Sequence, residues 1–260
     1  MKMPCAVYEL YLGMIGFAQV FSSPDFQHAE GPQQEPREPV AVVELFTSEG
    51  CSSCPPAEAY LNDLVAQARS SKKKIFPLAF HVDYWNHLGW KDEFSDARFS
   101  RRQREYASSR VTDGVYTPQM IVNGEAAFVG SNRQQGGWAI AKALQQPAEV
   151  GIVLRADYDT AAAIIKMVFE IAPAQPGGVL HLALVEGGIR REIRSGENRG
   201  RILLHENVVR ALKTVSLKKS VSGHAEFSVH PGLVADNAAV IAYVQDRETH
   251  RILGATSVYL

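Results

Sequence analysis

Two cysteines, Cys51 and Cys54, are the residues of this chain whose type and spacing can carry out chemistry. Their i, i+3 spacing lets the sulfurs meet on one turn, where they can form and release a disulfide. The apolar run 40–46 leads into them, and Pro55 and Pro56 follow at once, which predicts that a helix begins there. Because the amino end of a helix carries partial positive charge, it stabilises a thiolate. The pattern predicts a redox-active pair in which Cys51 is exposed and attacks while Cys54 is shielded and resolves the mixed disulfide.

Other interpretations of the cysteine pair remain beside this one. Half of a zinc site would need two further ligands, and the sequence has no second Cys-x-x-Cys and no His-x-x-x-His. Copper binding would use the pair with His81 or His87, because thiolates suit Cu(I). A purely structural disulfide over so short a span removes little loop entropy and would stabilise the fold only slightly. We expect no resident metal or cofactor, with a copper-binding protein and a non-catalytic secreted binding module, its disulfide vestigial, as the alternatives.

The composition is that of a globular protein. The chain has 260 residues, of which 46% are hydrophobic and 21% charged, and its formal net charge is −1. This balance gives no reason to expect a nucleic acid as a partner. The remaining cysteine, Cys5, lies near the start of the sequence, so no framework of structural disulfides is predicted.

Residues 1–23 are predicted to be a signal peptide. Lys2 supplies a minimal positive region, and the segment 7–20 is mostly apolar, although Glu9 interrupts it. The apolar stretch is too short and too interrupted for a stable membrane span. Residues 24–39 are polar and rich in proline and are predicted to be a flexible leader. We therefore expect an exported protein, either periplasmic or secreted.

The elements that position the cysteines follow from apolar periodicity. Helical spacing over 57–68 and an apolar run over 75–82 predict a helix and a second strand after the first. A strand, a helix and a strand at this spacing form a βαβ unit with parallel strands and a right-handed connection. The residues after the second strand then emerge at the same edge as Cys51, which places Asp83 and Trp85 beside it.

The rest of the first half is predicted to contain two helices and a hairpin. An amphipathic pattern predicts a helix over 95–108 that caps the edge of the sheet carrying the cysteines. Pro118 opens a short apolar strand, and Asn123-Gly124 is a hairpin turn that leads into a strand at 126–129. A further helix is predicted over 131–146.

Together these motifs resemble the thioredoxin fold, and the wider match resembles a thioredoxin-like family of secreted proteins of unknown function. The matching segments are 44–51, the run Asp83-Tyr-Trp-Asn86, and Tyr116-Thr-Pro-Gln-Met120. The resemblance implies that Pro118 is cis and lies against the disulfide, and that the backbone of Thr117 pairs with the main chain of a substrate. It implies protein thiols or disulfides as substrates, with Trp85 expected to join Thr117 and Pro118 in binding them.

Three carboxylates are predicted to tune the pKa of the cysteine pair. Glu49 is two residues from Cys51 and would raise its pKa if the carboxylate points inward. The buried acid that assists thioredoxin would sit nearer Leu45, so Glu44 or Asp83 would have to take its place. These departures, together with Ser52-Ser53 between the cysteines, leave the redox direction open.

The second half is predicted to be all β. Turn residues separate alternating apolar segments, which predict strands at 150–154, 165–171, 179–185, 224–229, 238–244 and 252–259. The arginines between 190 and 210 are predicted to lie on a solvated hairpin face, with a binding surface for an acidic partner as the alternative. The predicted fold class is an α/β thioredoxin-like domain at 40–147 followed by an all-β antiparallel sandwich-like domain at 148–260, which could carry a partner surface.

Overall fold

The computed structural model describes residues 37–217 and 221–260, which belong to one compact unit. The signal peptide predicted for 1–23 lies outside the described residues, as does nearly all of the leader predicted for 24–39. The helices are α1 (Pro55–Ser70), α2 (Ala97–Ser108), α3 (Arg133–Ala143) and the short 3₁₀ helix η1 (Ala235–Asn237). The strands are β1 (Val40–Thr47), β2 (Lys74–His81), β3 (Gln119–Val122), β4 (Ala126–Val129), β5 (Gly151–Asp159), β6 (Ile164–Ala172), β7 (Gly178–Glu186), β8 (Ile189–Glu192), β9 (Ile202–His205), β10 (Val208–Ser216), β11 (Ser222–Ser228), β12 (Ala238–Asp246) and β13 (Ile252–Tyr259).

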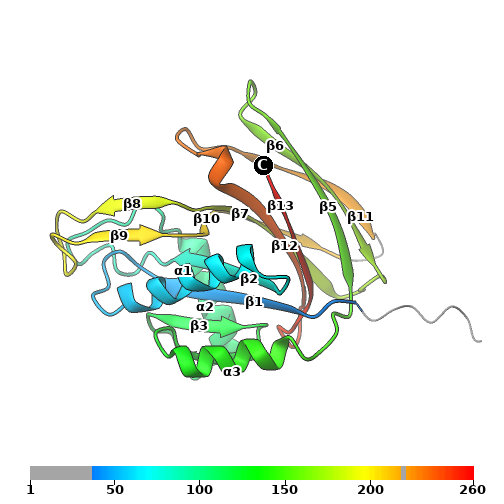
Figure 1. Ribbon diagram of the computed structural model, residues 1–260, viewed down its shortest axis with the longest axis horizontal. Coiled ribbons are helices and arrows are strands. Elements are labelled where there is room, and N and C mark those ends of the chain that lie inside the picture. The colour runs from blue at the N-terminus through cyan, green and yellow to red at the C-terminus, as the bar shows by residue number, and fades with distance from the viewer. Residues whose placement is uncertain (1–36, 218–220) are drawn as a thin grey trace, which may run out of the picture. The chain divides into compact units, whose positions relative to one another are not determined.

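A mixed sheet of eight strands forms the centre of this unit, in the order β13-β12-β7-β10-β2-β1-β3-β4 (Figure 1). As predicted, β1 and β2 are parallel and α1 connects them, with a register that runs from Val40 opposite Lys74 to Thr47 opposite His81. On the other side of β1, β3 and β4 add an antiparallel hairpin. The remaining strands form a three-stranded sheet, β11-β6-β5, and the two-stranded β8-β9 hairpin.

The predicted fold class is wrong, because the strands of the second half continue the sheet that β1 and β2 begin. The joining element is β10, which the sequence analysis did not predict. Val208 of β10 pairs in parallel with Ala79 of β2, and the rest of β10 pairs antiparallel with β7. β2 is buried along almost its whole length, so its second edge needs a hydrogen-bonding partner. The protein is therefore a mostly β structure around one large mixed sheet, and a thioredoxin-like α/β domain followed by a separate sandwich is not what the chain forms.

Both faces of the large sheet are covered. One face packs against α2 through aromatic side chains that include Phe46, Phe80 and Tyr243. On the opposite face, α1 and α3 cover β1 and β3, and the β11-β6-β5 sheet covers β7 and β12. Because successive side chains of a strand alternate between faces, Glu44 faces α2 whereas Thr47 faces α1. This alternation decides which polar residues of β1 lie near the cysteines.

Most other predicted elements are present with shifted ends. The helices predicted over 95–108 and 131–146 are α2 and α3, and the six strands predicted in the second half are β5, β6, β7, β11, β12 and β13. β8 and β9 form a hairpin in the arginine-rich segment, and β10 begins at its end; none of the three was predicted as a strand. In the part of the chain that the structure describes, no helix has the length and apolar character needed to cross a membrane.

Candidate disulfide site

A disulfide joins Cys51 and Cys54 where β1 turns into α1. The backbone N–H of Cys51 donates to the carbonyl of Ser48 at 3.1 Å, and the N–H of Cys54 donates to the carbonyl of Cys51 at 3.2 Å. Cys54 is the N-cap residue of α1, and Pro55 begins the helix, where a missing N–H costs nothing. The strand, the turn and the helix start therefore follow the prediction from sequence.

The prediction that Cys51 is exposed is wrong. Both cysteines are 0% exposed, although Ser52 and Ser53 between them are exposed. A segment far along the chain, between β8 and β9, is hydrogen-bonded to the backbone of the cysteine turn. The Asn198 side-chain amide donates to the carbonyls of Glu49 at 2.8 Å and Cys51 at 2.9 Å. Next to it, the Glu197 carboxylate accepts from the backbone N–H of Ser52 at 3.0 Å.

Two of the predicted substrate-binding residues lie beside Cys51. The Trp85 indole N–H donates to the Thr117 hydroxyl at 2.8 Å, and that hydroxyl donates to the Cys51 Sγ at 3.4 Å. The Ser53 hydroxyl lies 3.2 Å from the same sulfur. The Thr117–Pro118 peptide bond is cis, as the resemblance implied. The structure thus brings Trp85 and Thr117 together with Cys51 from three separate segments of the chain.

Pro118 is buried close to the first turn of α1. The surroundings of Gly130 show this closeness, because the N–H of Gly130 donates to the carbonyl of Pro118 at 2.9 Å. A Cβ added to Gly130 would lie 3.2 Å from the Cβ of Pro118 and 3.1 Å from the Cβ of Ala57. The Leu45 side chain would be closer still, at 2.7 Å. A glycine at this position therefore allows β4, Pro118 and α1 to approach one another.

Glu49 points into the protein and is neutralised there. Its carboxylate is 0% exposed, and the Trp90 indole N–H donates to it at 2.8 Å. The Arg191 guanidinium of β8 and the His205 imidazole of β9 each lie 3.2 Å from its Oε1. Arg191 therefore makes an internal ion pair instead of lying on a solvated face, and the charge that Glu49 presents towards Cys51 is largely balanced.

The other two carboxylates that were predicted to tune the cysteines interact with α2. Glu44 forms a buried ion pair with Arg102, whose Nε lies 2.6 Å from its Oε1, and it also accepts from the hydroxyls of Tyr106 and Tyr243. Asp83 accepts from the Ser100 hydroxyl at 2.5 Å. Strand alternation places Glu44 on the sheet face opposite α1, which is why nearness to Leu45 in sequence did not bring it towards the cysteines.

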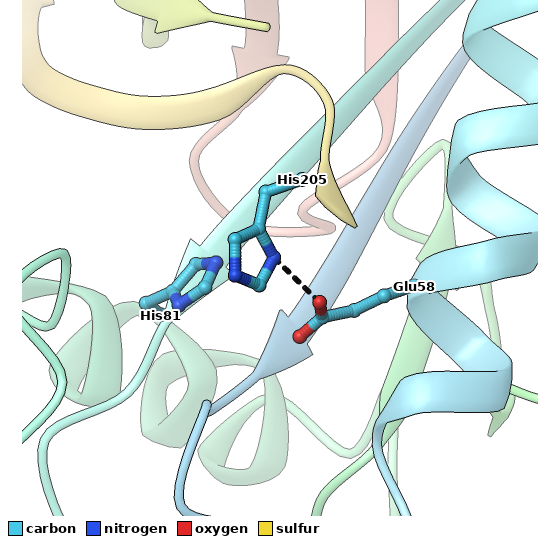
Figure 2. Close-up of side chains that lie close together, drawn as sticks. All are labelled: Glu58, His81 and His205. Atoms are coloured by element: carbon cyan, nitrogen blue, oxygen red, sulfur yellow. Dashed lines mark ion pairs between the residues drawn. The ribbon is translucent and has the colours of Figure 1, made fainter. Parts of the chain in front are cut away.

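A buried polar cluster at the start of α1 was not recognised as a unit from the sequence. Glu58, in the first turn of α1, accepts from the Thr47 hydroxyl at 2.6 Å and pairs with His205 Nδ1 at 2.6 Å (Figure 2). His81 at the end of β2 holds its Nδ1 2.7 Å from Asp92 Oδ2. Alternation along β1 and β2 puts Thr47 and His81 on the α1 face, and this alternation was the sequence signal that could have indicated that the two residues lie together near α1. His205 could not be placed, because β9 was not predicted.

Charges within this cluster stabilise one another. Burial favours the neutral form of His205, but the charge of Glu58, and the hydrogen bonds that the ring N–H groups donate to Glu49 and Glu58, outweigh burial and raise the pKa of His205 to about 10. Burial likewise raises the pKa of Glu58, but the charge of His205 outweighs it and lowers that pKa below its ordinary value. Burial also raises the pKa of Asp92, but the contact with His81 outweighs burial and lowers that pKa below its ordinary value. Glu58 and His205 are therefore an ion pair at neutral pH.

The fold and the site define a mostly β protein with a covered disulfide at a helix start. Residues 42–245 match the model of the family described as "Protein of unknown function (DUF1223)", and the chain belongs to that family. No curated protein matches the chain.

Two solved structures are similar over most of the chain. One is a crystal structure of a protein from Agrobacterium tumefaciens, 25% identical, with a TM-score of 0.61 over 86% of this chain and 96% of that chain. The other is HBP35 of Porphyromonas gingivalis, 15% identical, with a TM-score of 0.63 over 87% of this chain and 77% of that chain. The second likeness concerns the fold alone.

Proposed function

We propose that this protein is exported and acts on protein thiols or disulfides through Cys51 and Cys54. The observation that carries the proposal is a disulfide of i, i+3 spacing at the amino end of α1, a helix of 16 residues. The partial positive charge of that helix end favours a thiolate when the disulfide is reduced. A disulfide of this kind persists in an oxidising compartment, which supports export.

The exchange proceeds through a mixed disulfide. A substrate thiolate attacks Cys51 Sγ, the bond to Cys54 breaks, and Cys54 leaves as a thiolate. A second substrate thiolate then attacks the substrate sulfur of the mixed disulfide, which releases the oxidised substrate and the Cys51 thiolate. The substrate loses two electrons and the cysteine pair gains them; the reverse sequence reduces a substrate. The Thr117 hydroxyl donates to Cys51 Sγ and so stabilises negative charge on that sulfur.

The buried sulfur of Cys51 requires an opening step before exchange. Asn198 and Glu197 hold the cysteine turn through hydrogen bonds between 2.8 and 3.0 Å long. We infer that the segment carrying them moves aside when a substrate binds, while the half-buried Trp85 remains at the rim of the site. A substrate strand could then pair with the backbone of Thr117.

Two cysteine variants test this function in a Cys5→Ser background, which leaves only the pair to react. Cys51→Ser is expected to abolish exchange with a model peptide disulfide, and Cys54→Ser to accumulate the mixed disulfide. Equal exchange by Cys51→Ser and its parent would contradict the proposal. The reduction potential of the pair gives the direction, because about −270 mV is typical of a reductant and about −120 mV of an oxidant.

The burial of both sulfurs favours one other candidate, a non-catalytic binding module that keeps the disulfide as a relic. That candidate predicts slow alkylation of reduced Cys51 at neutral pH and no mixed disulfide. Copper binding by the reduced pair is a separate outcome, which titration of the reduced protein with Cu(I) decides.

A further inference from the structure

Glu58, His81 and His205 bring three metal-ligating side chains to one buried place at the start of α1. One donor atom of each lies within 4.8 Å of the other two. Figure 2 shows the His81 and His205 rings directed towards each other, with Glu58 reaching His205 from α1. We propose that this cluster binds a divalent transition-metal ion, Zn²⁺ in particular, through His81 Nε2, an imidazole nitrogen of His205 and a carboxylate oxygen of Glu58.

His81 is already arranged as a ligand. Its Nδ1 lies 2.7 Å from Asp92 Oδ2, and because a carboxylate can only accept, that nitrogen carries a proton. Nε2, the other ring nitrogen, is then the atom left to bind a metal ion. This atom is fully buried and has no hydrogen-bond partner among residues 37–217 and 221–260. A buried polar atom without a partner is unfavourable, and a metal ion would satisfy it.

The groups around the ligands match the outer shell that metal-binding histidines require. Such a histidine usually holds its second ring nitrogen against a carboxylate, which fixes the ring and makes the ligand more basic. Asp92 does this for His81, and its position is fixed by the backbone N–H groups of Glu49 at 2.9 Å and Phe94 at 2.9 Å. Glu49 Oε1, 3.2 Å from His205 Nε2, supplies either the same support or a fourth ligand.

The charges also suit a divalent cation. The carboxylates of Glu49, Glu58 and Asp92 are all buried, and the guanidinium in contact with them is that of Arg191. Histidines bind metals in the neutral form, so three carboxylates and one guanidinium leave two negative charges. A divalent ion bound there would cancel them.

The site must contract to hold the ion. With Zn–N and Zn–O distances near 2.1 Å, tetrahedral ligands lie about 3.4 Å apart, so separations of up to 4.8 Å must shrink by as much as about 1.4 Å. Rotations of the Glu58 and His205 side chains can supply this. Imidazole and carboxylate donors favour zinc over hard ions such as Mg²⁺, and Co²⁺ is a suitable spectroscopic substitute.

The experiment titrates the metal-free full-length protein with Co²⁺, keeping the disulfide oxidised and Cys5 replaced by serine. We expect the visible absorption of four-coordinate Co²⁺ at one equivalent, and its loss on competition with Zn²⁺. His81→Asn keeps an N–H donor for Asp92 but lacks Nε2, so it isolates the ligand atom. Asp92→Asn is expected to weaken binding roughly 10- to 100-fold, and His81→Asn to weaken it further. His181→Asn is the matched control, since it alters a buried histidine elsewhere and should leave the affinity unchanged.

Three results would overturn the proposal. The first is no Co²⁺ absorption from wild type after long incubation and after refolding with the metal present. The second is equal affinity of wild type and His81→Asn. The third is Co²⁺ binding only after the disulfide is reduced, with a sulfur-to-cobalt charge-transfer band, which would place the ion at the cysteines. If His81→Asn does not fold, X-ray absorption of the wild-type Co²⁺ complex must still show imidazole ligands and no sulfur.

Discussion

Asn198 donates its side-chain amide to the carbonyl of Cys51 at 2.9 Å, from a position 147 residues further along the chain. The same amide donates to the carbonyl of Glu49 at 2.8 Å, so one side chain ties the segment between β8 and β9 to the disulfide turn. This contact makes the accessibility of the disulfide depend on a loop that contributes no sulfur.

Asn198→Ala should therefore make the disulfide easier to reduce. Loss of one or two hydrogen bonds of about 1 kcal/mol each raises the fraction of molecules in which the segment between β8 and β9 has moved aside roughly 5- to 30-fold. The measurement is the rate of reduction by dithiothreitol, followed by mass shift after alkylation. Asn62→Ala is the control. Asn62 lies on α1, and its side-chain amide donates a similar bond to the carbonyl of Leu204 in β9, on the same β8-β9 hairpin but away from the cysteines. Equal rates for the two variants would show that the segment does not gate the sulfurs.

Thr117→Val should raise the pKa of the Cys51 thiol. The substitution keeps the shape of the side chain but removes the hydroxyl that lies 3.4 Å from Sγ. A hydrogen bond to a charged group contributes about 1.5 kcal/mol, so the rise should approach one unit. The check is the pH dependence of alkylation in Cys54→Ser, which leaves Cys51 free, again with Cys5 replaced. Thr112→Val, whose hydroxyl donates to the carbonyl of Gly114, should leave the profile unchanged.

Arg102→Met should destabilise the fold strongly. Arg102 is 5% exposed and Glu44 is 1% exposed, so the substitution leaves a carboxylate buried without its partner. Breaking a buried pair in this way costs about 3–5 kcal/mol. Urea denaturation gives the free energy of unfolding. The exposed pair of Arg133 with Asp63 provides the comparison, because Arg133→Met should cost less than about 1 kcal/mol. Similar losses for both variants would contradict the expectation, and adding Glu44→Gln to Arg102→Met should recover stability.

His181 should make the protein less stable in mild acid. Burial, together with the positive charge of Arg102, lowers its pKa well below the ordinary value of 6.5, and Gln245 and His250 also face it. Below about pH 6.5 the unfolded chain binds a proton that the folded chain does not, so stability falls as the pH falls, by about 1.4 kcal/mol per unit. Above that pH both states are neutral at this residue and its contribution is constant.

The measurement compares the free energy of unfolding of wild type and His181→Asn between pH 7 and the acid side. Below about pH 6.5, the slope of the free energy of unfolding against pH should be smaller in the variant by nearly 1.4 kcal/mol per pH unit, which corresponds to one proton. His224→Asn, an exposed residue of β11, is the control and should keep the wild-type slope. Parallel curves for wild type and His181→Asn would show that His181 is protonated in the folded protein.

The sequence was sufficient for the elements around the disulfide, because their signals are local. An apolar run, a pair of prolines and helical spacing predicted β1, α1 and β2. The return of the chain to the same edge placed Trp85 near Cys51, and the resemblance supplied the cis bond before Pro118. Each of these inferences depends on residues close together in the sequence or on a general rule of parallel strands.

The parts that failed depend on contacts between distant segments. β10 buries Val208 and Val209 but also carries Arg210 and Lys213, so its pattern does not read as a core strand. Without β10 the second half looked like a separate domain, and without β9 there was no reason to place His205 next to Glu58. The hydrogen bonds of Asn198 to the cysteine turn likewise join distant segments, and Asn198 has no periodic signal.

Because Val208 of β10 pairs with Ala79 of β2, one edge of β2 has no partner until a segment more than a hundred residues further along the chain has been synthesised. A nascent chain that ends within the first half carries an unfinished sheet edge of apolar residues, which is a template for aggregation. Pairings between residues so far apart in the sequence slow folding. A truncated protein that contains only the cysteine-bearing first half would therefore lack β10, the strand that pairs with β2.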